Sequence, residues 1–317
     1  MPIDPIIQRV TKSNWDEWRL PLMTLFERSF SRKLSSNYFD WRYVNNQESI
    51  FISVAGESEK PIASYSSAPV ILTQNQNRLS SIISMTTMTS PEARGLGLFA
   101  LLGEDVYAHA IDSGVGFVWG FPNRLIHDPR KRKLAWHDIY ELPMLTLGLD
   151  GHHNSIKESA SRVTEDRQFE LLYNPINYGG LIRTERTSDF LKWRYLNHPV
   201  NKYNNYVIEE NGKVLSHIVT KSYLEGIDLV DIQVSCEADA TDLLNFVIQK
   251  SLRDEHKMIS CWASVHHFVH GILERLGFEN SGPVTYFCGR ELIEGASPIG
   301  WRGFSNWYIQ MGDSDVY

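Results

Sequence analysis

The sequence predicts an α/β protein made of two tandem units, each a mixed, largely antiparallel sheet flanked by helices. The first observation is a short pattern that occurs twice: Phe-Asp-Trp-Arg-Tyr at residues 39–43 returns as Leu-Lys-Trp-Arg-Tyr at residues 191–195. The second is that similar elements follow each copy in the same order, over roughly 110 residues. The third is length, because 317 residues suffice for two domains.

The strands and helices predicted after the two copies correspond one by one. Apolar runs predict the buried strands, and apolar residues at helical spacing predict the helices. In the second copy, Asn-Gly at residues 211–212 is a strong signal for a hairpin turn. The predicted pairs are strands 51–55 and 206–210, strands 82–88 and 227–234, helices 98–113 and 240–253, and strands 115–120 and 258–263.

A polar segment at residues 150–161 separates the two copies. It is rich in Gly, His, Asn and Ser, a composition typical of connecting segments. We therefore expect domains at residues 1–150 and 151–317. We also expect a monomer in which the two domains form a pseudo-dimer.

The charge and hydropathy of the chain exclude two classes of partner. A net charge of −7 argues against a nucleic-acid partner, because such binding depends on clustered Lys and Arg. No stretch approaches the roughly 18 apolar residues that a membrane helix requires. The sequence therefore predicts a cytoplasmic protein that binds neither nucleic acid nor membrane.

The cysteines and histidines predict no metal site. Cys236, Cys261 and Cys288 are widely spaced and form no C-x-x-C pair, which favours a reducing compartment. The histidines within residues 266–270 have helical spacing but no neighbouring cysteine motif or carboxylate. We interpret them as part of a helix face.

The segment with the clearest chemistry is residues 88–99, Met-Thr-Ser-Pro-Glu-Ala-Arg-Gly-Leu-Gly-Leu-Phe. It leads from a strand through a proline-containing turn into a helix. Gly95 and Gly97 allow the backbone to turn its N–H groups toward a ligand. Next to the first turn of a helix, such amides form a pyrophosphate site. The third glycine of the dinucleotide fingerprint and the Gly-Lys-Ser/Thr of the P-loop are both absent.

Residues 90–97 resemble the acyl-CoA loop of the GNAT superfamily of N-acyltransferases, whose core is Arg/Gln-x-x-Gly-x-Gly/Ala. Arg94 and Gly97 match, whereas Phe99 stands where the family prefers Gly or Ala. Gly-Phe-Pro-Asn at residues 120–123 resembles the strand end that receives the pantetheine arm in this family. The resemblance implies acyl-CoA as co-substrate, no metal, and a donor site made of Met88, Arg94, Gly95, Leu96, Gly97, Leu98, Phe99 and Asn123.

The second copy has no such loop. Residues 235–241 read Ser-Cys-Glu-Ala-Asp-Ala-Thr, without glycine and with two acidic side chains that would repel pyrophosphate. We therefore expect one CoA site per chain. The second domain is then a packing partner and one wall of the acceptor pocket.

Attack on a thioester needs a neutral amine, so a general base is expected. Residues 60–91 contain no Asp or Glu, and Lys131 occupies the place of the tyrosine that protonates the thiolate in many relatives. His127 and Asn123 are the predicted catalytic residues, because they lie at or just after the splayed strand end and histidine titrates near neutrality. Asp128, His137 and Asp138 are further candidates, and the alternative for His137 and Asp138 is a strand that flanks the helix. The alternative for His127 is a surface position. The basic run at residues 129–133 indicates either a solvated helix face or attraction of a phosphorylated ligand.

Six further side chains are predicted to contact the acceptor. The Trp-Arg-Tyr triplet occurs in both copies, so a requirement of the fold is the alternative for its members. The aromatic C-terminal segment is either a packed strand or a stacking wall for a nucleotide base. The predicted acceptor contacts are Tyr38, Arg42, Trp119, Asp231, Trp307 and Asp313.

The combination of two GNAT-like units with these motifs resembles N-acyltransferases of bacterial surface-polysaccharide (O-antigen) pathways. Their acceptors include nucleotide-linked amino sugars, and some transfer a 3-hydroxybutanoyl group to dTDP-3-amino-3,6-dideoxyhexoses. The resemblance implies transfer of an acyl group from acyl-CoA to such an amine. Two alternatives remain: a GNAT acetyltransferase for another small amine or peptide, and a non-catalytic CoA-binding module.

Overall fold

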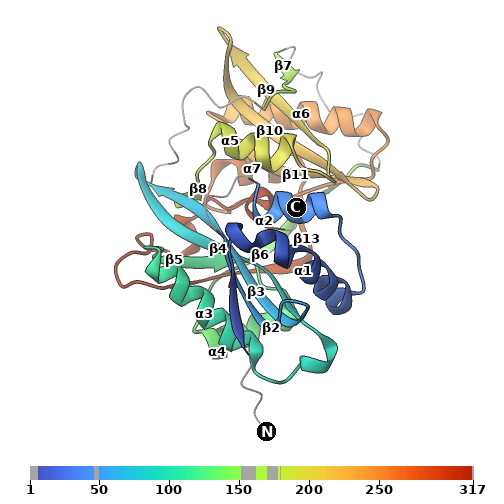
Figure 1. The fold of residues 1–317 in the computed structure, drawn as a ribbon. Coiled ribbons are helices and arrows are strands. Elements are labelled where there is room, and N and C mark those ends of the chain that lie inside the picture. The colour runs from blue at the N-terminus through green and yellow to red at the C-terminus, as the bar shows by residue number, and fades with distance from the viewer. Residues whose placement is uncertain (1–5, 46–49, 151–161, 170–177, 179, 316–317) are drawn as a thin grey trace. The chain divides into compact units, whose positions relative to one another are not determined.

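The computed structural model describes residues 6–45, 50–150, 162–169, 178 and 180–315 (Figure 1). The chain divides into two compact units. The first unit comprises Met1–Tyr140 and Tyr286–Arg302, and the second comprises Glu141–Thr285 and Gly303–Tyr317. Among the described residues, no helix combines the length and the apolar character that crossing a membrane requires.

The first unit begins with a short strand and two helices, continues with three antiparallel strands, and then alternates helices and strands. A 3₁₀ turn, Pro91–Ala93, precedes its third helix. Its elements are β1 (Ile7–Val10), α1 (Trp15–Phe30), α2 (Ser36–Tyr43), β2 (Phe51–Glu57), β3 (Lys60–Gln74), β4 (Asn77–Thr89), α3 (Leu98–Asp112), β5 (Phe117–Gly120), α4 (Arg124–Leu134) and the start of β6 (His137–Gly148).

From residue 188 onward, the second unit repeats the order of elements that the first unit has from residue 36. Its helix α5 continues as a π-helical turn, Lys192–Leu196, which carries the second Trp-Arg-Tyr triplet. Short 3₁₀ turns, Phe304–Asn306 and Met311–Asp313, form the C-terminal segment. The named elements are β7 (Val163–Glu165), β8 (Arg183–Thr184), α5 (Ser188–Leu191), β9 (Tyr203–Glu210), β10 (Lys213–Tyr223), β11 (Gly226–Gln233), α6 (Glu237–Arg253), β12 (Met258–Cys261), α7 (Phe268–Arg275) and β13 (Glu279–Glu291).

The two units have the same strand order. In the first it is β1-β2-β3-β4-β5-β13, and in the second β7-β9-β10-β11-β12-β6. In both, the fourth and fifth strands are parallel and the other neighbours are antiparallel. The helix between the parallel strands, α3 or α6, is the crossover that such a pair requires. Two copies of one mixed, largely antiparallel unit are therefore present.

The sixth strand of each unit comes from the other half of the chain. Residues 288–291 of β13 pair with β5, and residues 145–148 of β6 pair with β12. The division expected at residue 150 therefore differs from the observed one, because the chain leaves the first unit near residue 140 and returns to it at residues 286–302. Both crossing segments are long continuous strands.

Each unit has its own apolar core. In the first, α3 and α4 pack with β2 to β5 around residues such as Tyr65, Leu102 and Leu134. In the second, α6 and α7 pack with β9 to β12 around residues such as Leu229 and Leu243. Strand β4 and helix α3 are both packed in the core of the first unit, so this core positions the loop between them.

Candidate functional site

The loop between β4 and α3 adopts the backbone conformation that its glycines predict. Gly95 and Gly97 have φ angles of 85° and 79°, in the left-handed region that favours glycine. Gly97 is the N-cap residue of α3 and supplies no capping side chain. The N–H groups of Ala100 and Leu101 bond to the Gly97 carbonyl oxygen, so the hydrogen-bond ladder of the helix starts there. The N–H groups of the first turn remain for a ligand.

The space in front of this loop is open. Among the described residues, a Cβ atom added to Gly95 or Gly97 would meet no atom within 4 Å beyond the adjacent residues of the chain. Residues 94–97 are exposed, whereas Leu98 is buried and anchors the start of the helix. Free amides at a helix N-terminus attract anions, because the helix dipole places partial positive charge there. The geometry of the loop is therefore compatible with the expected anion site.

Basic side chains accompany the loop. Arg94 donates a hydrogen bond from Nη2 to the Ser29 carbonyl oxygen at 3.3 Å, which ties the loop to the end of α1. Arg28 forms an ion pair with Glu92. A backbone hydrogen bond and the charge of Arg28 lower the pKa of Glu92. The negative charge of Glu92 next to the loop is thus partly offset by the positive charge of Arg28.

Phe99 does not block the loop. Its side chain is half-buried and packs on the Tyr65 ring, with ring centroids 5.7 Å apart. The bulky ring therefore fills core space, while the backbone of Phe99 lies in the first turn of α3. Met88 is buried near the end of β4.

Strands β4 and β5 separate just below this loop. They pair in parallel from Ser81 to Ile83, and β4 then has a bulge between Ser84 and Thr87. Strand β5 ends at Gly120, whose added Cβ would lie 3.1 Å from the Ser84 carbonyl oxygen. The two strands are close together at Ser84 and Gly120 and do not pair beyond these residues. Bulges often end strand pairing in this way near functional sites.

The second unit also has a parallel strand pair whose pairing ends at a bulge. Pairing of β11 with β12 ends at Leu229, and a bulge follows between Leu229 and Asp231. At the start of α6, however, Asp239 accepts hydrogen bonds from Ser216 and Ser235 at 2.6 Å each and from Arg162 at 2.5 Å. Burial opposes ionisation, but these donors hold the pKa of Asp239 below its usual value. An internal carboxylate therefore lies in the first turn of α6.

Asn123 caps a helix. Its side-chain oxygen accepts hydrogen bonds from the backbone N–H groups of Leu125 at 2.9 Å and Ile126 at 3.3 Å. This N-cap fixes the start of α4 directly after the end of β5. Its predicted catalytic and donor-binding roles stay predictions; the observed contacts position the helix.

His127 belongs to a polar cluster on α4. Its Nε2 lies 2.6 Å from Asp138 Oδ1, and its ring stacks on Tyr286 with centroids 3.9 Å apart. Lys131 also bonds to Asp138, and Cys288 donates from Sγ to Asp138 at 3.3 Å. Burial opposes ionisation, but the bonds from Lys131 and His127 lower the pKa of Asp138. His127 is therefore a histidine oriented by a carboxylate, the usual arrangement of a general base.

The same cluster contains three donor types that zinc accepts. The ligand atoms of His127, Asp138 and Cys288 all lie within 4.8 Å of one another. The Lys131 ammonium bonds to the same carboxylate and disfavours a second cation there. Burial also raises the pKa of the Cys288 thiol, and the thiolate is the form that binds metal. These observations favour the carboxylate–histidine pair over a metal centre.

Two of the predicted acceptor contacts lie beside β4. Arg42 is buried and donates from Nη1 to the Tyr38 hydroxyl at 2.9 Å and from Nη2 to Thr86 Oγ1 at 3.0 Å. Thr86 lies in the bulge of β4. The first Trp-Arg-Tyr triplet thus connects α2 to the strand that separates from β5. Trp119 is fully buried and donates from Nε1 to Ser81 Oγ at 3.0 Å.

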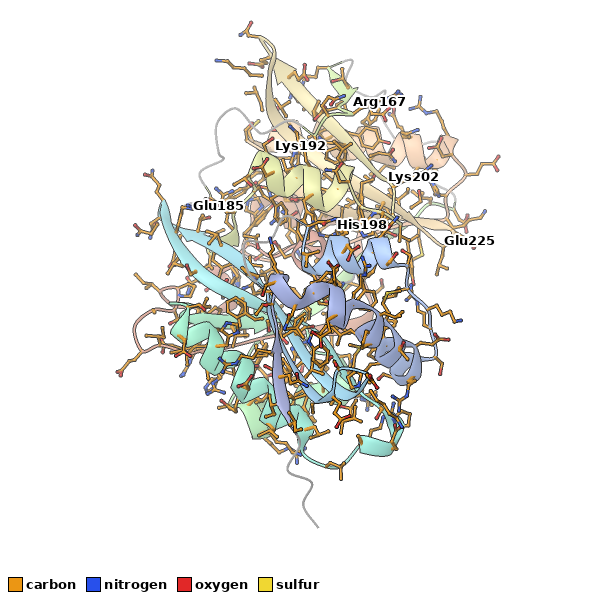
Figure 2. The ribbon with its side chains drawn as sticks, in the orientation of Figure 1. Arg167, Glu185, Lys192, His198, Lys202 and Glu225 are labelled. Carbon is orange, nitrogen blue, oxygen red and sulfur yellow. The ribbon has the colours of Figure 1, made fainter. Side chains whose placement is uncertain are left out.

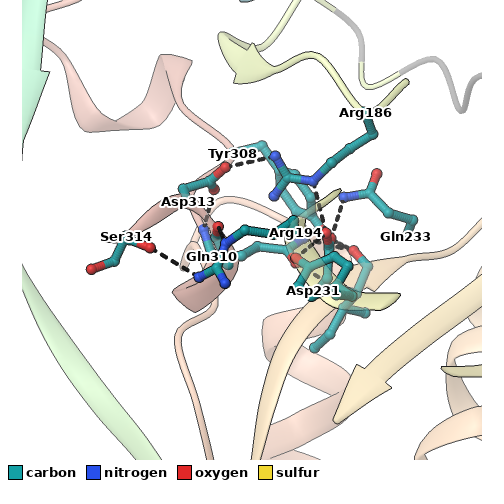
Figure 3. A network of polar contacts seen from close by, with 11 residues as sticks. Arg186, Arg194, Asp231, Gln233, Tyr308, Gln310, Asp313 and Ser314 are labelled. Atoms are coloured by element: carbon teal, nitrogen blue, oxygen red, sulfur yellow. Dashed lines mark hydrogen bonds and ion pairs between the residues drawn. The ribbon is translucent and has the colours of Figure 1, made fainter. Parts of the chain in front are cut away.

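Asp231 and Asp313 belong to a buried network in the second unit (Figure 3). Arg186 forms ion pairs with Asp231 at 2.7 Å and with Asp313 at 2.8 Å. Trp307 is fully buried. Lys192 is one of the exposed charged side chains of this unit (Figure 2). Asp231 and Asp313 therefore have internal partners, Trp307 is a core residue, and the aromatic C-terminal segment is packed as 3₁₀ turns rather than as a strand.

A separate cavity of about 140 Å³ lies in the second unit. It is lined by polar side chains of β9, β10 and α6, including Asn204, Lys250 and Asp254. Ligand sites usually enclose about 300 Å³ or more. The cavity is therefore too small for a nucleotide sugar, and it contains no predicted site residue.

Sequence reasoning missed one side chain at the separation of β4 and β5. Within the basic run at residues 129–133, Arg130 is 2% exposed and donates to Ser84 at 2.8 Å, whereas Lys131 points to Asp138 at the surface. The run is therefore not uniformly a solvated face. A signal was available, because Arg130 lies four residues from both Ile126 and Leu134.

Comparison of the sequence with protein-family models and with curated proteins gives no match. Comparison of the structure does. A probable N-acyltransferase of unknown function from Enterococcus faecalis V583 is similar over 90% of this chain and 72% of that chain, with a TM-score of 0.69 and 12% identity. For a GCN5-related N-acetyltransferase from Anabaena variabilis the coverage is 92% and 74%, the TM-score 0.67 and the identity 13%.

A third similar structure is N-myristoyltransferase from Saccharomyces cerevisiae with bound myristoyl-CoA. It matches over 90% of this chain and 84% of that chain, with a TM-score of 0.59 and 10% identity. The chain has a GNAT-like fold. The predicted fold class is confirmed, and at these identities the likeness concerns the fold alone.

Proposed function

We propose that this GNAT-like protein is an acyl-CoA-dependent N-acyltransferase. One observation carries the proposal: an open, glycine-containing turn at the N-terminus of α3 lies next to the point where β4 and β5 separate. The turn offers amides to a pyrophosphate, and the separated strands offer unpaired backbone groups to an amide-containing arm. CoA has both parts. The yeast neighbour of similar fold carries bound myristoyl-CoA.

In this proposal, the donor pyrophosphate contacts the backbone of Gly95 to Phe99, with Arg94 nearby. The pantetheine arm follows β4 toward Ser84 and Gly120. The acceptor amine attacks the thioester carbonyl carbon, and collapse of the tetrahedral adduct breaks the C–S bond. The products are an amide and the CoA thiolate. The amine proton leaves to His127, whose imidazolium Asp138 stabilises.

We further propose that the acceptor amine belongs to a nucleotide-linked amino sugar. The resemblance of the sequence motifs to enzymes of surface-polysaccharide pathways supports this choice. Tyr38 and Arg42 supply a hydroxyl and a guanidinium beside the bulge of β4, close to the expected thioester. Such donors suit the hydroxyl and phosphate oxygens of a sugar nucleotide.

The experiment has two stages that separate donor from acceptor. Calorimetric titration with CoA, acetyl-CoA and 3-hydroxybutanoyl-CoA tests the donor site, with one site per chain expected. Mass spectrometry of mixtures with dTDP- and UDP-linked amino sugars then tests transfer, and polyamines and peptides serve as competing acceptors. Acylation of a polyamine or peptide alone would reject the sugar acceptor. CoA binding without transfer to any amine would favour a non-catalytic module, and absence of CoA binding would overturn the proposal.

A further inference from the structure

Arg130 is a buried cation whose hydrogen-bonding groups are only partly used. It is 2% exposed, and Nη2 donates to Ser84 Oγ at 2.8 Å. Its Nε and Nη1 are buried and have no hydrogen-bond partner within the described part of the chain. Among the residues that the structure describes, no carboxylate forms an ion pair with it. An uncompensated buried charge is costly, so its presence calls for an explanation, and contact with a ligand is one.

The surroundings of Arg130 are neutral and hold it in place. Its guanidinium carbon lies 4.6 Å from the centre of the Trp136 ring and 5.9 Å from that of Tyr65. Ser84 in turn donates to the Tyr65 hydroxyl at 3.0 Å, and Tyr65 and Tyr107 share a hydrogen bond of 2.7 Å. This network is built entirely from neutral groups. It orients the guanidinium without cancelling its charge.

The free Nη1 lies at the separation of the parallel strands. It is 3.7 Å from the position that a Cβ atom on Gly120 would occupy, and the same Cβ would lie 3.1 Å from the Ser84 carbonyl oxygen. Ser84 is the last residue before the bulge in β4, and Gly120 is the last residue of β5. Arg130 therefore lies where the pairing of β4 with β5 ends.

We propose that Arg130 is a catalytic residue that binds the sulfur of CoA and stabilises the thiolate as it leaves. This inference rests on the proposed function, and it assigns a second anionic contact, distinct from the pyrophosphate, to the same donor. The pyrophosphate lies at the exposed loop, whereas Arg130 lies at the buried end of the strand gap. The thiol end of the same molecule is the part that would reach it.

The chemistry balances without a proton donor at the sulfur. When the tetrahedral adduct collapses, the electron pair of the C–S bond moves to sulfur, and the thiolate pairs with the guanidinium. The amine proton leaves to the base, so no second proton is needed on the enzyme. Lys131, which stands where many relatives have a tyrosine, is bonded to Asp138 instead. Arg130 thus stabilises the leaving thiolate by its positive charge, whereas a tyrosine hydroxyl protonates the thiolate in many relatives.

The test compares CoA with desulfo-CoA, which lacks the thiol, on the full-length protein. Calorimetric Kd values are measured for both between pH 6.5 and pH 9.5, and their ratio cancels the titration of the phosphates. A cation within about 4–6 Å lowers a thiol pKa by roughly 1–3 units from about 8.5. The affinity for CoA relative to desulfo-CoA should therefore rise at least tenfold with pH. Arg130→Met should abolish this rise, and Arg130→Lys should keep part of it.

The outcomes separate the two proposals. If both ligands bind wild-type protein with the same pH dependence, the CoA site stands and the role of Arg130 is rejected. This comparison needs no variant, so misfolding of Arg130→Met cannot obscure it. If neither ligand binds at any pH, both proposals fail. A preference for succinyl-CoA over acetyl-CoA without the pH effect would instead assign Arg130 to a carboxylate on the acyl chain, and would overturn the thiolate role.

Discussion

His127 and Asp138 form a hydrogen-bonded pair across the end of α4, with Nε2 and Oδ1 2.6 Å apart. The carboxylate fixes which ring nitrogen faces it, so the other nitrogen is left to accept a proton. The ring is held flat against Tyr286. Sequence spacing alone gave His127 no partner, and the structure provides one from the following strand.

We expect His127→Ala to lower kcat by about 10²-fold or more with little change in either KM, since a general base acts in the transition state. Asp138→Asn should also lower kcat, because a neutral amide does not stabilise the imidazolium. His137→Ala, at the exposed start of the same strand, is the control and should be near wild type. Steady-state kinetics with a productive acceptor measures all three. Normal turnover by His127→Ala would show that solvent removes the proton.

Gly97→Ala should weaken CoA binding at least tenfold. The positive φ is strained for any residue with a Cβ, by about 1–2 kcal/mol, and the added carbon would fill the open space in front of the loop. Gly114→Ala is a matched control, because Gly114 also has a positive φ (77°) and open surroundings, after the other end of α3. Both variants should lose similar stability in thermal melts, and calorimetry should show lost affinity in Gly97→Ala alone. Equal CoA affinity in the two variants would reject the loop assignment.

The order of elements within each unit could be predicted from the sequence, because it rests on local patterns. The hairpin at residues 211–212 and the start of α3 at Leu98 follow from turn chemistry and apolar spacing. The exchange of the sixth strands could not. Segments 145–148 and 288–291 read as ordinary strands, and nothing local to either states which neighbour it will pair with. Pairing between distant segments is decided by the whole sheet.

The residues of the candidate site could likewise be predicted from the sequence only where a local pattern restricts them. Gly95 and Gly97 were identifiable because a positive φ restricts residue type. Arg130 and Lys131 are adjacent in a basic run, yet Arg130 is buried and Lys131 is exposed. Charge alone favours the surface for both. The apolar positions four residues either side of Arg130 were the available indication, and charge outweighed them in the sequence reasoning.

Gln310→Ala should destabilise the second unit by roughly 2–4 kcal/mol. Gln310 bonds to both the N–H and the carbonyl of Ile232, so its loss leaves the buried N–H without this acceptor, while the carbonyl keeps only the bond from the Tyr308 hydroxyl. Gln168→Ala, at an exposed position of the same unit, should cost little. Urea unfolding followed by tryptophan fluorescence measures both. If Gln310→Ala has wild-type stability but impaired acceptor binding, the C-terminal segment contacts substrate rather than holding the fold.

The second unit should lose stability in acid through Asp231. This carboxylate is fully buried, and although burial opposes ionisation, Arg186 holds its pKa below the ordinary value of about 3.9. A lowered pKa in the folded state means that the stabilisation is complete above that ordinary value. It is lost as the pH falls through the lower pKa of the folded protein, because the proton then binds against the ion pair.

Asp231→Asn should remove much of this acid dependence and cost about 3–5 kcal/mol at neutral pH, as expected when a buried pair loses one partner. The residual pairing of Arg186 with Asp313 should keep the unit folded. Asp254→Asn breaks an exposed pair with Lys250 and should cost less than about 1 kcal/mol. Free energies of unfolding from pH 2 to pH 7 distinguish the two. An unchanged acid slope in Asp231→Asn would mean that other carboxylates govern acid unfolding, and that the Arg186–Asp231 pair is not ionised in the way its geometry indicates.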